Sequence, residues 1–138
     1  MGTDIRAFVE LDTEGPRAGT RCFAELSFGR DYVMFDLLFA VRGEPEDGKP
    51  ASARPGRGFP SRVSPVLARV SEGWPADQSA GADEHGVGWL DASEVVRFHE
   101  RVLATGHRSS ELAAIAAMMT KLAPDEPSRC RLVFWFNS

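Results

Sequence analysis

The feature that most constrains the fold is the run of residues 131–136, near the carboxyl end of the 138-residue chain. Its sequence, Arg-Leu-Val-Phe-Trp-Phe, places large side chains at both odd and even positions. Because successive side chains of a strand point to opposite faces of the sheet, this run predicts a strand that is buried on both faces. We therefore expect residues 131–136 to lie at the centre of a sheet.

Two further strands are predicted near the amino terminus. Apolar residues alternate with polar or aromatic ones over residues 5–11, which is typical of a strand. A turn rich in Gly and Pro follows, and a second strand is expected near residues 20–27. Together these segments predict a hairpin with a loop longer than two residues.

Helix signals occupy most of the remaining chain. Residues 31–41 are apolar in every direction around a helix, with Asp36 as the only interior charge, so a fully buried helix is expected. Ser64 followed by Pro65 predicts the start of a short helix. Asp91 and Glu94 form a capping-box pattern that opens a helix running to about residue 104.

The last predicted helix begins at Ser109 or Ser110 and runs through Leu122, and Pro124 ends it. The expected class is therefore α+β, with a small mixed sheet of at least three strands covered by three or four helices. The chain length suits a single globular domain over residues 1–138. Long loops are expected near residues 42–60 and 75–88, where Gly, Pro and polar residues are frequent.

Composition excludes several classes of protein. No apolar run approaches the 18–20 residues, roughly, that cross a bilayer. An acid at Asp4 and the lack of an early apolar run argue against a secretory signal, so we expect a cytoplasmic protein. A net charge of −4 argues against nucleic-acid binding, which requires a positive surface. Cys22 and Cys130, far apart in sequence, form no zinc motif and are expected to be reduced.

Charge is distributed unevenly along the chain. Residues 48–71 contain five basic and no acidic side chains, whereas residues 72–100 contain seven acids and a single base, Arg97. The two stretches either neutralise each other within the fold or are solvated separately. Alternatively, the arginines form an anion site, because guanidinium binds phosphate or carboxylate through two parallel hydrogen bonds.

Few residues suggest chemistry on their own. His85, in a loop flanked by glycines, is a candidate general base, and Asp4 at the start of the first strand is a candidate acid–base group. His99 projects from an apolar helix face and is expected to be a core histidine. No known phosphate-loop, nucleophile-elbow or helical zinc motif is present, so no metal site is predicted and no cofactor is indicated.

Several short segments along the chain carry a resemblance to known proteins. They are Met-Gly-Thr-Asp-Ile-Arg at the start, Gly-Arg-Asp-Tyr-Val-Met-Phe from Gly29, Val41-Arg42, Arg-Gly-Phe-Pro from Arg57, Asp-Glu-His-Gly-Val-Gly-Trp-Leu from Asp83, and residues 131–136. In this order they resemble segments of an uncharacterised family of small bacterial and bacteriophage proteins, which opens with Met-Gly-Cys-Asp-Ile-His and ends with Arg-Ile-Val-Phe-Trp-Phe. The family has no established activity.

The resemblance implies a shared set of polar and aromatic residues. Its members are Asp4, Arg30, Tyr32, Arg42, Arg57, His85, Trp89 and Arg131. The chain departs from the family pattern at Thr3 and Arg6, where the family has Cys and His, and at Gly88, where it has Ser. Any chemistry that depends on that Cys and His is therefore in doubt here.

Two functions are compatible with these observations. The first is a small-ligand-binding domain, enzymatic or not, whose pocket takes an anionic ligand such as a nucleotide or phosphate ester. Its binding residues are Arg30, Tyr32, Arg42, Arg57, Trp89 and Arg131, with His85 and Asp4 as the catalytic candidates. The second is a phage- or prophage-type protein that binds and modulates a host protein through the acidic stretch 72–100. An assembly subunit is not separable from the second by sequence.

Overall fold

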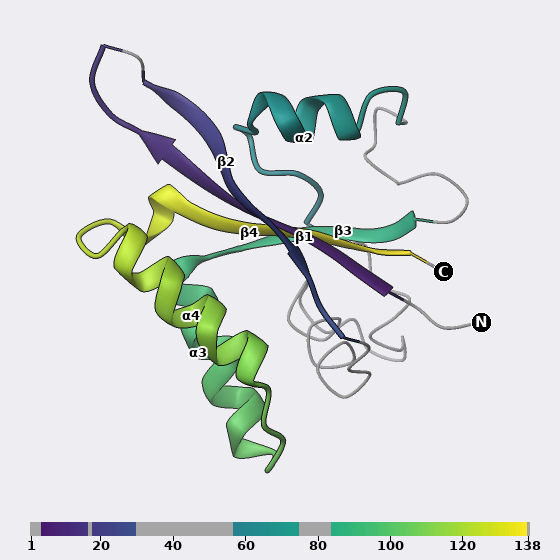
Figure 1. The fold of residues 1–138 in the computed structure, drawn as a ribbon, viewed down its shortest axis with the longest axis vertical. Helices are drawn as coiled ribbons and strands as arrows, with labels where there is room; N and C mark the ends of the chain where they lie inside the picture. The colour runs from purple at the N-terminus through teal and green to yellow at the C-terminus, as the bar shows by residue number, and fades with distance from the viewer. Residues whose placement is uncertain (1–3, 17, 30–56, 75–83, 138) are drawn as a thin grey trace.

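The structure is a computed structural model that describes residues 4–16, 18–29, 57–74 and 84–137. The described residues form a four-stranded sheet in the order β2-β1-β4-β3 (Figure 1). Its strands are β1 (Asp4–Thr13), β2 (Gly19–Ser27), β3 (Glu84–Asp91) and β4 (Cys130–Asn137). Each neighbouring pair of strands is antiparallel. β4, near the carboxyl end of the chain, lies between β1 and β3.

The two central strands, β1 and β4, are buried on both faces. One face carries alternate residues of β1, such as Ala7 and Val9, next to Leu132 and Phe134 of β4. The helices α3 (Ala92–Ala104) and α4 (Ser110–Leu122) pack against each other and cover this face (Figure 1). We call it the helical face.

The opposite face is covered by the segment 57–74, which includes the short helix α2 (Pro65–Val70) (Figure 1). Phe8 of β1 stacks on Trp135 of β4 with ring centroids 5.3 Å apart. Trp74 meets Trp135 edge-on at 5.1 Å and stacks on Phe59 at 5.6 Å. These rings join the covering segment to the sheet, and we call this side the aromatic face.

A buried carboxylate also connects the covering segment to the sheet. Glu10 of β1 is fully buried, and its Oε1 accepts a hydrogen bond of 2.6 Å from the backbone N–H of Ser64. Ser64 is itself the N-cap of α2, because its hydroxyl accepts from the N–H of Leu67. The hydrogen bond between Ser64 and Glu10 therefore fixes the start of α2 over the apolar side chains of the aromatic face.

The helix ends follow local sequence signals. The Asp91 carboxylate caps α3 by accepting a hydrogen bond from the backbone N–H of Glu94. The Glu94 carboxylate in turn accepts one from the backbone N–H of Asp91, which completes a capping box. Gly106 after α3 has a φ of 84°, a left-handed conformation that glycine adopts without strain. Ser109 caps α4 through the N–H of Leu112.

The α+β class is confirmed, as are the amino-terminal hairpin, the helices after Ser64, Asp91 and Ser109, and the central position of residues 131–136. The sheet is antiparallel at every described pairing. The predicted helix over residues 31–41, with Asp36, lies outside the described residues, as do residues 42–56 of the predicted loop.

One prediction needs correction. Residues 84–88 were expected to belong to a loop, but they form the first part of β3. Gly86 and Gly88 interrupt the apolar alternation that marks a strand, and the register with β4 shifts between His85 and Gly88. Residues 75–83 lie outside the described part of the chain.

Among the described residues, no helix combines the length and apolar character that a membrane span needs. Both cysteines are free, Cys130 in the core and Cys22 partly buried on β2.

The aromatic face should dominate stability. Replacing Phe8 with Ala removes a fully buried ring that stacks on Trp135, so we expect a loss of about 3–5 kcal/mol in the free energy of unfolding, measured by chemical denaturation. Phe23 is the matched control, since its side chain is 42% exposed. Phe23→Ala should cost under about 1 kcal/mol, and equal losses in the two variants would contradict the assigned core.

Candidate ligand-binding site

The structure brings together Arg57 and Trp89, two of the residues selected from the sequence. The Arg57 guanidinium carbon lies 4.1 Å from the centroid of the Trp89 ring, a cation–π contact. Nη1 of Arg57 donates to the backbone oxygen of Trp89 at 2.8 Å and to both carboxylate oxygens of Glu94 at 3.0 Å. Arg57, Trp89 and Glu94 therefore form one cluster, which we call the Arg57 cluster.

Three elements position this cluster. Trp89 lies on β3 opposite Val133 of β4, and both side chains belong to the aromatic face. Glu94 is in the first turn of α3, where the capping box fixes its carboxylate next to the end of β3. Arg57 precedes Gly58, whose N–H donates to the backbone oxygen of Val87 at 3.0 Å. The start of the covering segment is thus attached to the edge strand of the sheet.

The ion pair within the cluster is partly open to solvent. The side chains of Arg57 and Glu94 are 33% and 24% exposed. A pair with this exposure is expected to contribute about 1 kcal/mol or less, because water screens it. The pair also joins the basic stretch 48–71 to the acidic stretch 72–100, so opposite charges of the two stretches neutralise each other here.

Arg131, another predicted binding residue, is committed to a different interaction. Its two terminal nitrogens bond the carboxylate of Asp12 at 2.6 and 2.9 Å, and Nη1 also donates to the backbone oxygen of Ser128. The hydrogen bonds from Arg131 hold the pKa of Asp12 below its usual value, against the opposing effect of burial. Arg131 therefore serves as a link between β1 and β4.

The backbone register places the two catalytic candidates at one end of the sheet. Asp4 begins β1 opposite Asn137 of β4, and His85 on β3 lies opposite Phe136 of β4. Asp4 and His85 are therefore on strands separated by β4, opposite consecutive residues of that strand. Trp89 lies four positions further along β3 than His85. Asp4 is exposed and has interactions of its own. Arg30, Tyr32 and Arg42 lie outside the described residues.

The sequence did not identify three charged residues that lie in or beside the Arg57 cluster. Glu94 was assigned only to the capping box, yet its carboxylate also binds Arg57. Arg97 and Arg101 line a cavity of about 210 Å³ together with Glu94 and Phe98. Their spacing of one helical turn from Glu94 and from each other was available in the sequence, but nothing local connected them to Arg57.

The thiols are poor candidates for nucleophiles. Burial raises the pKa of Cys130 to about 11. Burial, together with the neighbouring carboxylates of Glu10 and Glu25, also raises the pKa of Cys22. Both side chains are thus protonated near neutral pH, and the thiolate is the reactive form. Within the described residues, no group of three His, Cys, Asp or Glu side chains is arranged to hold a metal ion.

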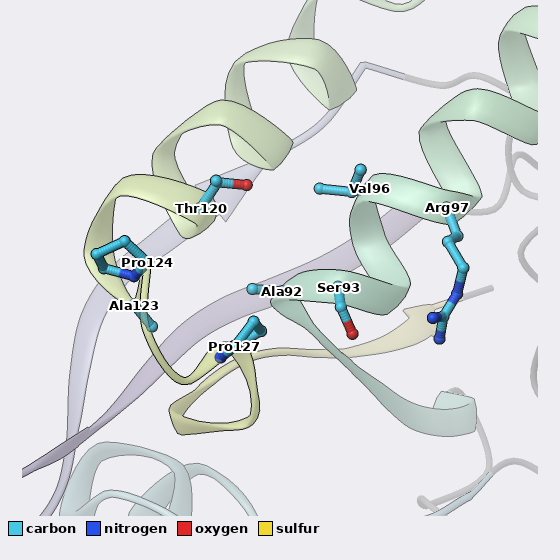
Figure 2. Close-up of a pocket in the computed structure, with 8 residues that line it drawn as sticks. All are labelled: Ala92, Ser93, Val96, Arg97, Thr120, Ala123, Pro124 and Pro127. Atoms are coloured by element: carbon cyan, nitrogen blue, oxygen red, sulfur yellow. The ribbon is translucent and has the colours of Figure 1, made fainter.

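A larger groove lies between the start of α3 and the end of α4 (Figure 2). It has a volume of about 340 Å³, and its walls are mostly apolar, with Ala92, Val96, Ala123, Pro124 and Pro127 among them. The Arg97 side chain stands at one end and extends away from Thr120 and Pro124. None of the described residues that line the groove is a site residue predicted from the sequence.

No protein-family model, curated protein or solved structure matches this chain. The resemblance to the bacterial and bacteriophage family therefore stays a prediction, and the geometry of the described residues carries the functional argument.

The Asp12–Arg131 pair provides a test of the structural role assigned to Arg131. Arg131 and Asp12 are only 8% and 18% exposed, so Asp12→Asn leaves a buried guanidinium unpaired and should lower stability by about 3 kcal/mol at pH 7. The pKa of Asp12 is lowered by folding from 3.8. Its stabilising effect is therefore complete above that value and disappears as the pH falls through the lower, folded-state value.

Denaturation curves of the wild type and Asp12→Asn, measured from pH 7 down to pH 2, should consequently converge at the acidic end. Glu25→Gln is the control, because the Arg6–Glu25 pair is 41% and 53% exposed and should contribute within about 0.5 kcal/mol. A constant difference between wild type and Asp12→Asn at every pH would contradict the assignment.

Proposed function

We propose that the protein is a small-ligand-binding domain that takes an anionic ligand, such as a nucleotide or phosphate ester, at the Arg57 cluster. The observation that carries this proposal is the Arg57 guanidinium, held 4.1 Å from the Trp89 ring while its side chain remains 33% exposed. A positioned, accessible guanidinium beside an aromatic ring offers both charge-assisted hydrogen bonds and an apolar surface to a ligand.

The orientation of Arg57 supports anion binding. All three of its hydrogen bonds to described residues come from Nη1, whereas a guanidinium has five N–H donors. Within the described residues, Nε and Nη2 make no hydrogen bond, so a carboxylate or phosphate can approach that side of the guanidinium. The contact with Trp89 keeps the guanidinium from rotating freely, which reduces the entropy lost on binding.

Glu94 acts as an internal competitor for the same guanidinium. Its carboxylate is a local anion that an incoming ligand must share or displace. Because the Arg57–Glu94 pair is partly solvated, the competition is weak enough for a ligand with greater negative charge to succeed.

The alternative, a protein that binds a host protein through residues 72–100, receives less support from the geometry. Two acids of that stretch, Asp91 and Glu94, are used in the capping box and in the Arg57 pair. Charges that are committed within the molecule contribute less to steering a partner. The ligand-binding function is therefore the better conclusion.

Calorimetric titration with AMP, and with adenosine as the uncharged comparison, tests the proposal. Arg57→Gln should weaken AMP binding at least about tenfold, which corresponds to the loss of one charge-assisted hydrogen-bonding group. Glu94→Gln should instead strengthen it by about two- to fivefold, since it removes the internal competitor while Gln still accepts the bond of the capping box.

Arg69→Gln is the matched control, because Arg69 is an exposed arginine of the same basic stretch at the end of α2. It should bind AMP like the wild type, and all three variants should keep the wild-type circular dichroism spectrum. Equal AMP affinity in the wild type and Arg57→Gln, or no binding of AMP by the wild type at millimolar concentration, would refute the proposal.

A further inference from the structure

The exposed side of α3 carries a small cavity next to the Arg57 cluster. Glu94, Arg97, Phe98 and Arg101 line it, and its volume is about 210 Å³. Phe98 is buried in the core, so among the described lining residues the polar groups are two guanidinium groups and one carboxylate. Glu94 belongs to both places, since it lines this cavity and pairs with Arg57.

The cavity has an excess of positive charge. Arg97 and Arg101 are four positions apart, so they occupy the same side of the helix and their charges repel each other. Within the described residues, neither forms an ion pair. The carboxylate of Glu94 is already bound to Arg57 and to the backbone N–H of Asp91. Two cations therefore share a cavity in which the one acid among the described lining residues is bound elsewhere.

The size of the cavity limits what it can hold. Pockets for whole drug-sized ligands begin at about 300 Å³, and this cavity is smaller at about 210 Å³. It suits one compact anionic group of a ligand and leaves the remainder outside. Two guanidinium groups match a doubly charged group better than a singly charged one, and a phosphate monoester is largely dianionic at pH 7.

We propose that Arg97 and Arg101, together with Arg57, bind the phosphate group of a phosphate monoester that takes the place of Glu94, while the remaining part of the ligand lies against Trp89. This inference rests on the proposed function for the contacts with Arg57 and Trp89, but the contribution of Arg97 and Arg101 stands on the cavity and its two arginines. It also distinguishes the ligand class, because a phosphate monoester contacts both the arginines and Trp89, whereas free phosphate contacts only the arginines.

Nuclear magnetic resonance titrations with inorganic phosphate and with AMP, at one ionic strength, test each part. In the wild type, both probes should shift the amide signals of α3, AMP should bind at least about threefold more tightly than phosphate, and acetate should produce no saturable shift. The double variant R97Q/R101Q should lose at least tenfold in affinity for both probes. Arg108→Gln, which removes an exposed arginine outside this cavity, should bind like the wild type.

The variant Arg57→Gln separates the two proposals. If it loses at least about tenfold in affinity for both phosphate and AMP, both proposals stand. If R97Q/R101Q loses affinity for phosphate but Arg57→Gln binds both probes like the wild type, the proposed function fails and the phosphate site remains. Unchanged phosphate affinity in R97Q/R101Q, with a folded spectrum, or no phosphate binding by the wild type would overturn the inference made here.

Discussion

The pairing of β1 with β4 is the interaction on which the rest of the structure depends. Both strands carry large apolar side chains on both faces, so neither face can remain in contact with water. The helices α3 and α4 cover one face, and segment 57–74 covers the other. The second cover contains little regular structure, and it is held by the aromatic contacts of Trp135 and by the bond from Ser64 to the buried carboxylate of Glu10.

The candidate site follows from the same requirement. Because β3 pairs with β4, Trp89 lies at the edge of the aromatic face, where the covering segment begins with Arg57. The helix α3 starts directly after β3, and its capping box brings Glu94 to the same place. Arg57 thus contributes to attaching the cover and also presents charge to solvent. Exchange of Glu94 for a ligand would keep the guanidinium neutralised, so ligand binding and the attachment of the cover are compatible.

Local signals explain what the sequence predicted correctly. The run at residues 131–136, the caps at Ser64, Asp91 and Ser109, and Gly106 act over a few positions, and each element follows from them. The partners of the charged residues could not be predicted in this way. Arg57 pairs with Glu94, which is 37 positions away in the sequence, and Arg131 pairs with Asp12, which is 119 positions away. Such pairs depend on which elements are neighbours in the fold, and Gly86 and Gly88 concealed the first part of β3.

Native mass spectrometry of the freshly purified protein, compared with its denatured mass, is the most direct test of the central claim that the chain holds a small anionic ligand at Arg57. We expect a population with additional mass that matches a phosphate ester. This population should disappear at high ionic strength and be absent from the Arg57→Gln protein. A native mass equal to that of the chain alone, both after purification and after incubation with AMP, would contradict the account.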